Sequence, residues 1–122
     1  MRIAWREMLA AIVMLSAAQV QAQDAETVAD IHCVIVGFKI AQLPDLTQKN
    51  AGTMLALYFI GRLDSRVPKL DMEELIVSEL SHMTAAEFDS EAKRCGGALS
   101  DKGQEFTRIG KDLSERAQKM QK

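Results

Sequence analysis

The sequence predicts a small all-α protein: a bundle of four helices, or of four to five, stapled by one disulfide and preceded by an N-terminal signal peptide. Three observations lead to this class: a short apolar segment near the start, further segments with helical periodicity, and two widely separated cysteines. The 122 residues include 7 glycines and 2 prolines, which do not gather into a linker. We therefore expect residues 23–122 to form a single helical domain.

The first 22 residues have the three parts of a secretory signal peptide. Arg2 and Arg6 give a positive start, Met8–Ala18 is a short apolar run, and small residues precede the expected cleavage after Ala22, with cleavage after Ala18 as the second choice. The alternative is a membrane anchor, which needs roughly 20 apolar residues, about twice this run. The segment predicts a periplasmic or secreted protein with no stable membrane anchor after cleavage.

The chain that remains after cleavage is mildly acidic. Residues 23–122 contain 13 lysines and arginines against 16 aspartates and glutamates, which gives a net charge of −3. Nucleic acids and anionic lipid surfaces both attract basic patches, so this charge argues against either as a partner. The partners that we expect are another protein or a second copy of the chain, as a homodimer.

Two cysteines, Cys33 and Cys95, lie in the exported part of the chain. An even pair in an oxidising compartment is read as a bridge, and a loop of this length gives about 4 kcal/mol of stability in the chain-entropy model. That is a large share of the roughly 5–15 kcal/mol of a small domain. The alternative is a pair of buried free thiols. The absence of a C-x-x-C motif argues against a thioredoxin-like role.

The first two helices are expected at about 26–43 and from 46 or 47 to 65. Asp24 can cap the first helix, which is apolar nearly all round and ends before Pro44. Its β-branched segment Val34–Val36 could instead form a strand, but the chain lacks a convincing second strand to pair with it. The second helix contains the apolar block Met54–Ile60. A helix that is apolar on all sides lies in the centre of a bundle or at an interface.

Two capping boxes predict the starts of the remaining helices. Asp71 with Glu74 opens a short helix that ends near Met83, and Thr84 with Glu87 opens the last one. In each box the two residues can satisfy free amides at the helix start.

The last segment has the clearest periodicity of the chain. Ten residues alternate spacings of four and three, as in a heptad seam with two charged interruptions: Phe88, Ala92, Cys95, Leu99, Lys102, Phe106, Ile109, Leu113, Arg116 and Met120. One helix over 85–119 would be about 52 Å long, against a radius of gyration of about 13 Å for a compact domain of this size. Either the helix breaks at Gly96-Gly97, or its end packs on a partner chain.

Gly96, Gly103 and Gly110 recur every seven residues beside this seam. One interpretation is a groove of small residues where another helix backbone comes close. The other is that they are ordinary breaks in a frayed tail, since each glycine costs a helix about 1 kcal/mol relative to alanine.

No set of residues in the sequence predicts catalysis. His32 and His82 fall on different elements without further ligands at metal spacing, and no nucleophile, phosphate-loop or dinucleotide motif appears. Arg62 and Arg66 lie where they suit a helix C-terminus, with an anion pocket as the alternative. We expect a non-enzymatic protein with no metal and no cofactor.

Several of these features occur together in a known family. The signal peptide, Cys33, Cys95 and the stretch Asp101–Lys111 with Phe106 give a plan that resembles the acid-activated periplasmic chaperones of enteric bacteria. Those are small exported helical proteins whose two cysteines join an early helix to a late one. The spacing of the cysteines is longer here, and the regular glycines and the Met54–Ile60 block have no counterpart there. The chain is also similar to uncharacterised small secreted helical proteins of Gram-negative bacteria, a resemblance that implies no activity.

These observations leave three hypotheses for the function. The first is a non-catalytic exported protein that binds other proteins, for example as a periplasmic stress chaperone, because two helices carry more apolar surface than a small domain needs. The second is a protein that binds a small apolar ligand in a cavity lined by Phe38, Met54, Leu57 and Tyr58. The third is a structural protein of the cell envelope.

Overall fold

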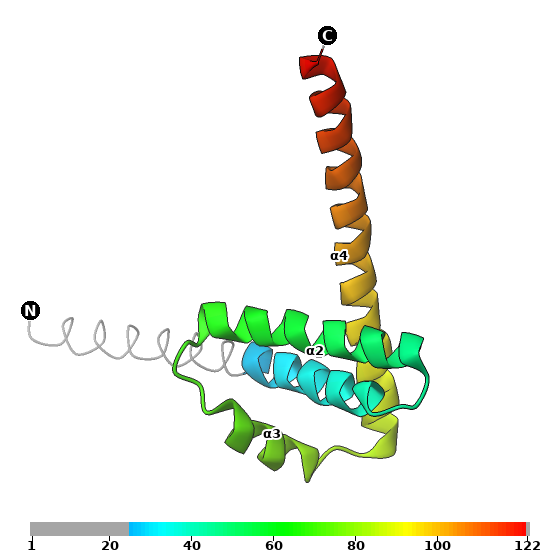
Figure 1. Ribbon diagram of the computed structural model, residues 1–122. Coiled ribbons are helices and arrows are strands. Elements are labelled where there is room, and N and C mark those ends of the chain that lie inside the picture. The colour runs from blue at the N-terminus through cyan, green and yellow to red at the C-terminus, as the bar shows by residue number, and fades with distance from the viewer. Residues whose placement is uncertain (1–24, 122) are drawn as a thin grey trace, which may run out of the picture.

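The computed structural model describes residues 25–121, and helices hold 83 of these 97 residues, with no strand among them. The first helix covers residues 25–41 of the described part, and α2 (Leu46–Arg66), α3 (Met72–Leu80) and α4 (Ala85–Met120) follow (Figure 1). The all-α prediction is therefore confirmed, and the strand alternative for Val34–Val36 is wrong. The expected signal peptide and the Asp24 cap lie outside the described residues.

The first helix, rather than α2, lies at the centre of the bundle. Figure 1 shows it between α2, α3 and the beginning of α4. Ile31 and the four consecutive residues Cys33–Val36 are at most 2% exposed, so the helix is buried on several sides at once. The core is completed from α2 and α4 by Leu55, Phe59, Leu63 and Cys95.

Two glycines let the backbones of the first helix and α2 touch. A Cβ atom added to Gly37 would lie 2.6 Å from the amide nitrogen of Ala56, and one added to Gly52 would lie 2.7 Å from the carbonyl oxygen of Gly37. Real Cβ atoms do not approach other atoms this closely, so these positions require glycine. This crossing could not be predicted, because the two glycines lie on different helices and at no regular spacing.

The helix starts follow the predicted caps. Asp71 accepts a hydrogen bond from the Glu74 amide at 3.1 Å, which is one half of the first predicted box. Thr84 and Glu87 form both halves of theirs, at 3.2 and 2.8 Å. The helix that Asp71 opens, α3, ends at Leu80 and so is slightly shorter than expected.

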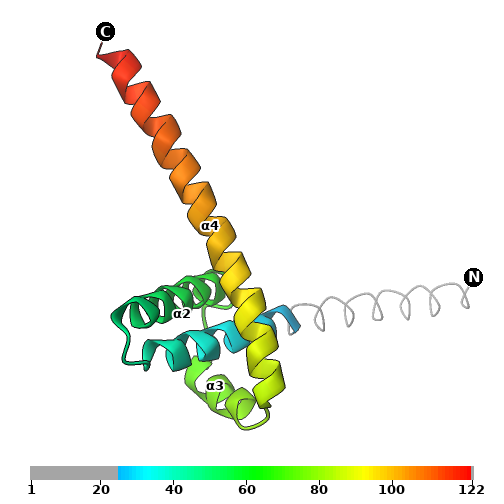
Figure 2. The same ribbon diagram turned by 90° about the vertical axis from the view of Figure 1, so that its right-hand side faces the viewer.

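The last helix does not break. α4 runs through Gly96 and Gly97 as one helix of 36 residues, about 54 Å long. Of the two alternatives that the sequence left open, the break at Gly96-Gly97 is therefore wrong. Breaking it would give up the hydrogen bonds of the adjoining turns, whereas the two glycines cost only about 1 kcal/mol each. Every residue from 100 to 121 is exposed, and this part of α4, here called the α4 arm, stands out from the bundle in both ribbon views (Figures 1 and 2).

Candidate protein-binding surface

The α4 arm carries an apolar stripe that is exposed along its length. Phe106 is 79% exposed, Leu113 61% and Met120 81%, and Ile109 lies between them on the same face. They continue the heptad seam whose earlier members pack against the core of the bundle. The apolar pattern thus extends well beyond the part of the helix that the bundle covers.

The glycines beside the stripe are open. A Cβ atom added to Gly96, Gly103 or Gly110 would meet no other atom within 4 Å. Within residues 25–121, no helix therefore occupies the groove that is one interpretation of their spacing. These glycines leave a flat strip along the edge of the stripe, where a second helix could approach closely.

The charges of the arm are paired along the helix. Lys102 donates to Glu105 at 2.6 Å, and Arg108 pairs with Asp112 at 3.0 Å. The hydrogen bond to Glu105 raises the pKa of Lys102, and the same bond lowers the pKa of Glu105. Residues 100–122 hold six basic and four acidic side chains, while residues 25–99 hold seven and eleven. Residues 100–122 are therefore basic, at +2, and residues 25–99 are acidic, at −4.

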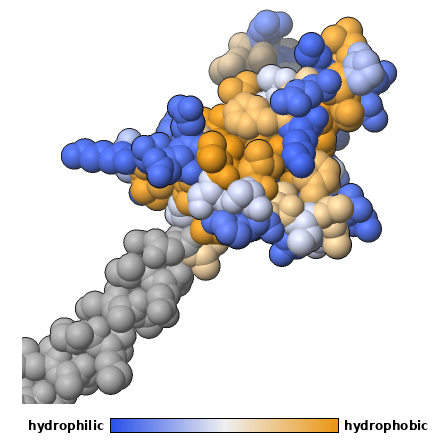
Figure 3. Space-filling view, turned by 90° about the horizontal axis from the view of Figure 1, so that it is seen from below, coloured by the Kyte–Doolittle hydropathy of each residue, from blue (hydrophilic) through white to orange (hydrophobic). Residues whose placement is uncertain are grey.

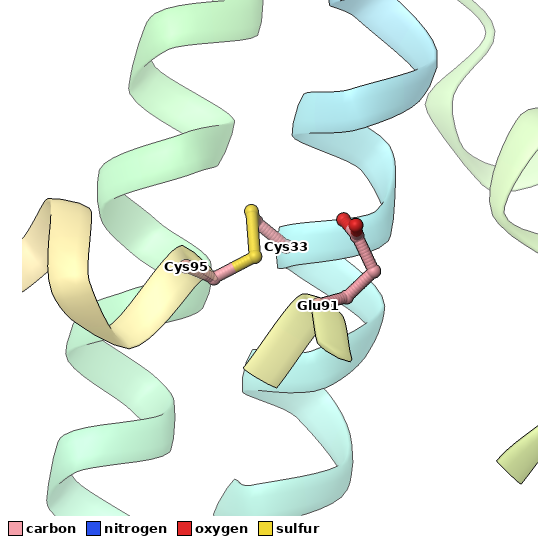
Figure 4. Close-up of side chains that lie close together, drawn as sticks. All are labelled: Cys33, Glu91 and Cys95. Atoms are coloured by element: carbon pink, nitrogen blue, oxygen red, sulfur yellow. A yellow bond between two sulfur atoms is a disulfide. The ribbon is translucent and has the colours of Figure 1, made fainter. Parts of the chain in front are cut away.

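The predicted disulfide is present and lies at the base of the arm. Cys33 and Cys95 are bonded, with their Cα atoms 5.5 Å apart, and both residues are fully buried. Figure 4 shows the bridge between the first helix and α4, with the Glu91 side chain reaching alongside the first helix. One Glu91 carboxylate oxygen lies within 4.8 Å of both sulfurs. Metal ligation by cysteine needs thiolates, so this trio offers no metal site while the bridge is intact.

Polar contacts hold α4 beside this bridge. Arg94 donates to the carbonyl oxygen of Ala29 at 2.8 Å and forms an ion pair with Glu91. His32 lies 2.9 Å from Glu79 on α3 and 3.7 Å from Glu91 on α4. His32 therefore links its own helix, the first, to both α3 and α4. His82 is not part of this group, since its ring faces the carbonyl oxygen of Ser78 at 2.8 Å.

The two arginines near the end of α2 contact carboxylates of the first helix. Arg62 and Arg66 reach the carboxylate of Asp30 at 3.1 and 2.9 Å, and Asp30 is only 2% exposed. Tyr58 and Asp30 raise the pKa of Arg62. The arginines thus neutralise a buried carboxylate, an arrangement that favours a structural role over an anion pocket.

The four residues predicted to line an apolar cavity are spread over two faces. Phe38 lies at a pocket of about 320 Å³ between the first helix and α3, lined by Ile35, Phe38, Lys39, Gln42, Ile76 and Leu80. Met54 and Leu57 are each 61% exposed on α2, and Tyr58 packs edge-on against Phe59. Figure 3 shows the bundle from below, with hydrophobic side chains gathered between hydrophilic ones. The pocket beside Phe38 is lined from the first helix and α3, without a residue of α2.

Comparisons with known proteins give no relative for this chain. No family model matches it, and neither a curated protein nor a solved structure is similar to it. None of the helices within residues 25–121 is both long enough and apolar enough to cross a membrane.

Proposed function

We propose that the chain is an exported, non-catalytic protein that binds other proteins through the apolar stripe of the α4 arm. The observation that carries this proposal is the arm itself. About 20 residues of regular helix make no core contact, yet they keep large apolar side chains at heptad spacing.

The energetics favour a partner for this surface. Burial of one large aliphatic or aromatic side chain gives roughly 1.5–3 kcal/mol, so covering Phe106, Ile109, Leu113 and Met120 supplies a substantial part of the free energy of association. A contiguous exposed apolar surface on a small protein marks an interaction site more often than it marks a free surface.

Export is supported by two independent features. The first 22 residues have the pattern of a signal peptide, and the chain carries a buried disulfide, a bond that persists in oxidising compartments. The mass of protein isolated from its own cells tests this part of the proposal. We expect a chain that begins after Ala22, and isolation of a chain that begins at Met1 contradicts export.

The chaperone form of the proposal is tested by light scattering. The mature protein is mixed with an aggregating client at pH 2–3 and at pH 7, and suppression of aggregation is expected in acid. A variant with Phe106→Ser and Leu113→Ser should lose this suppression, whereas Lys111→Ser, on the opposite face of the arm, should keep it. No suppression at either pH contradicts the chaperone role, and equal suppression by all variants contradicts the arm as the binding surface.

A second candidate function is the binding of a small apolar ligand. The pocket beside Phe38 favours it, since Ile35, Ile76 and Leu80 form most of the remaining wall. Native mass spectrometry of protein taken from its own compartment should then show a retained ligand, and Phe38→Ala should release it. A clean mass of the unliganded chain contradicts this function.

A further inference from the structure

We propose that the occupant of the α4 arm is the α4 arm of a second copy, packed antiparallel over its whole length. This inference rests on the proposed role of the arm as a protein-binding surface and names the partner.

One antiparallel register pairs all six seam residues of the arm, from Lys102 to Met120, with one another. In paired helices the two alternating seam positions form the contact layers. With the two arms antiparallel, Ile109 of each copy lies opposite Leu113 of the other, and these two pairs form the centre. The layers on either side place Phe106 against Arg116, and the outermost layers place Lys102 against Met120.

A parallel pair is disfavoured by the charged residues of the seam. In parallel register each residue meets its own copy, so Lys102 lies against Lys102 and Arg116 against Arg116. Like charges in direct opposition destabilise an interface. In the antiparallel register each of these cations lies beside an apolar side chain instead, and Arg116 can stack on the Phe106 ring as a cation–π pair.

The residues that flank the seam agree with the same register. Glu105 lies beside Lys119 of the second copy, and the symmetry repeats this pair at the other end. On the opposite edge, Gly110 meets Gly110, and Gly103 lies opposite Ala117. The open space beside these glycines allows the two backbones to approach closely. Asp112, at the centre, faces its own copy, but its carboxylate is already paired with Arg108 at 3.0 Å.

The length of the arm agrees with this register. The layers centre the pair on residue 111, and the exposed part of α4, residues 100–120, has its midpoint one residue earlier. The two arms therefore overlap completely, with a bundle at each end. The shared seam from Lys102 to Met120 is about 27 Å long.

The net charges favour the same arrangement. Residues 111–122 hold four basic and two acidic side chains, residues 100–110 hold two of each, and residues 25–99 carry −4. The antiparallel pair brings the basic tip of each arm to the neutral base of the other, next to its acidic bundle. A parallel pair would bring the two basic tips together and the two acidic bundles together.

Sedimentation equilibrium of the mature chain at low ionic strength tests the inference. We expect a dimer that Glu105→Lys and Lys119→Glu each weaken by about tenfold, because each replaces two attractive contacts by repulsive ones. An equal mixture of the two variants should restore the affinity, since each copy then supplies the charge that the other needs. The matched control is Glu115→Lys, which reverses a charge on the outer face of the arm and should leave the dimer unchanged.

The outcomes separate this inference from the proposed function. A chain that stays monomeric overturns the dimer, even where it suppresses client aggregation, and a mixture that fails to recover its affinity overturns the antiparallel register. A dimer with the expected charge pattern but no effect on a client supports the inference and contradicts the chaperone role.

Discussion

Removal of the α4 arm should leave the stability of the bundle unchanged. The change is a stop after Ser100, which deletes residues 101–122. All described residues of this segment are exposed, and they contribute nothing to the buried core. Surface changes of this kind usually alter the free energy of unfolding by less than about 0.5 kcal/mol. We therefore expect the midpoint of urea unfolding to stay within that limit.

The helical signal should fall although the stability does not. The deletion removes 20 of the 83 helical residues in the described part of the chain, so the far-ultraviolet circular dichroism should drop by about a quarter. Tyr58 gives a separate probe of the bundle, because it is the single tyrosine and packs against the core. In the full chain at concentrations where it is monomeric, the arm should unfold at lower urea than Tyr58 reports. Isolated helices of about this length are marginal in water.

The control is a stop after Arg94, which removes Cys95 and with it the disulfide. This shorter chain should lose most of its cooperative unfolding. A loss of more than about 2 kcal/mol on removal of the arm alone would show that the arm stabilises the bundle, contrary to its exposure, and would also remove the basis for treating it as a free binding surface.

Three further predictions concern the bundle. Replacing both Cys33 and Cys95 by alanine should lower the free energy of unfolding by about 4 kcal/mol, because the disulfide closes a loop with a sequence separation of 62. Urea denaturation measures this change. A loss below about 1 kcal/mol contradicts a main stabilising role for the disulfide. Gly52→Ala should destabilise the protein by about 1–3 kcal/mol, because the added Cβ meets the first helix. Gly61→Ala, with open space around it, should instead stabilise α2 by up to about 1 kcal/mol. Thermal unfolding of the two variants checks this, and equal shifts of their melting temperatures contradict the crossing. The Thr84 backbone amide lowers the pKa of Glu87, so this cap stabilises above the ordinary pKa of the carboxyl and is lost as the pH falls through the lowered one. The melting temperature of Glu87→Gln should therefore lie below that of the wild type at pH 6, and the two should converge as the pH falls below the lowered pKa. A constant difference contradicts the cap.

Local signals in the sequence were sufficient to predict the helices and the disulfide. The caps at Asp71 and Thr84 act within three residues, so their effect can be read without knowledge of the fold. The disulfide could be predicted because the chain has two cysteines and therefore one pairing.

Contacts between distant residues could not be predicted in this way. The regular spacing of Gly96, Gly103 and Gly110 drew attention to α4, whereas the close backbone contact is made by Gly37 and Gly52. That contact depends on the angle and height at which two helices cross, which neither helix encodes alone. The pairing of buried Asp30 with two arginines of α2 depends on the same crossing. The continuity of α4 also stayed open, because the length of the helix against the size of the domain allowed either a break or an end that extends to a partner.

The position of the disulfide explains how so long a helix can serve as an arm. Cys95 is the last fully buried residue of α4, and the exposed arm begins five residues later. A covalent bond to the central helix therefore fixes the root of the arm. Arg94, one residue before Cys95, adds a hydrogen bond to the carbonyl oxygen of Ala29. In the proposed dimer, two such roots lie about 48 Å apart along the paired helices, so the bridge sets the separation and direction of the bundles. Reduction of the disulfide should consequently weaken the attachment of each arm to its own bundle. The contact between the two arms should stay intact, because it contains no cysteine.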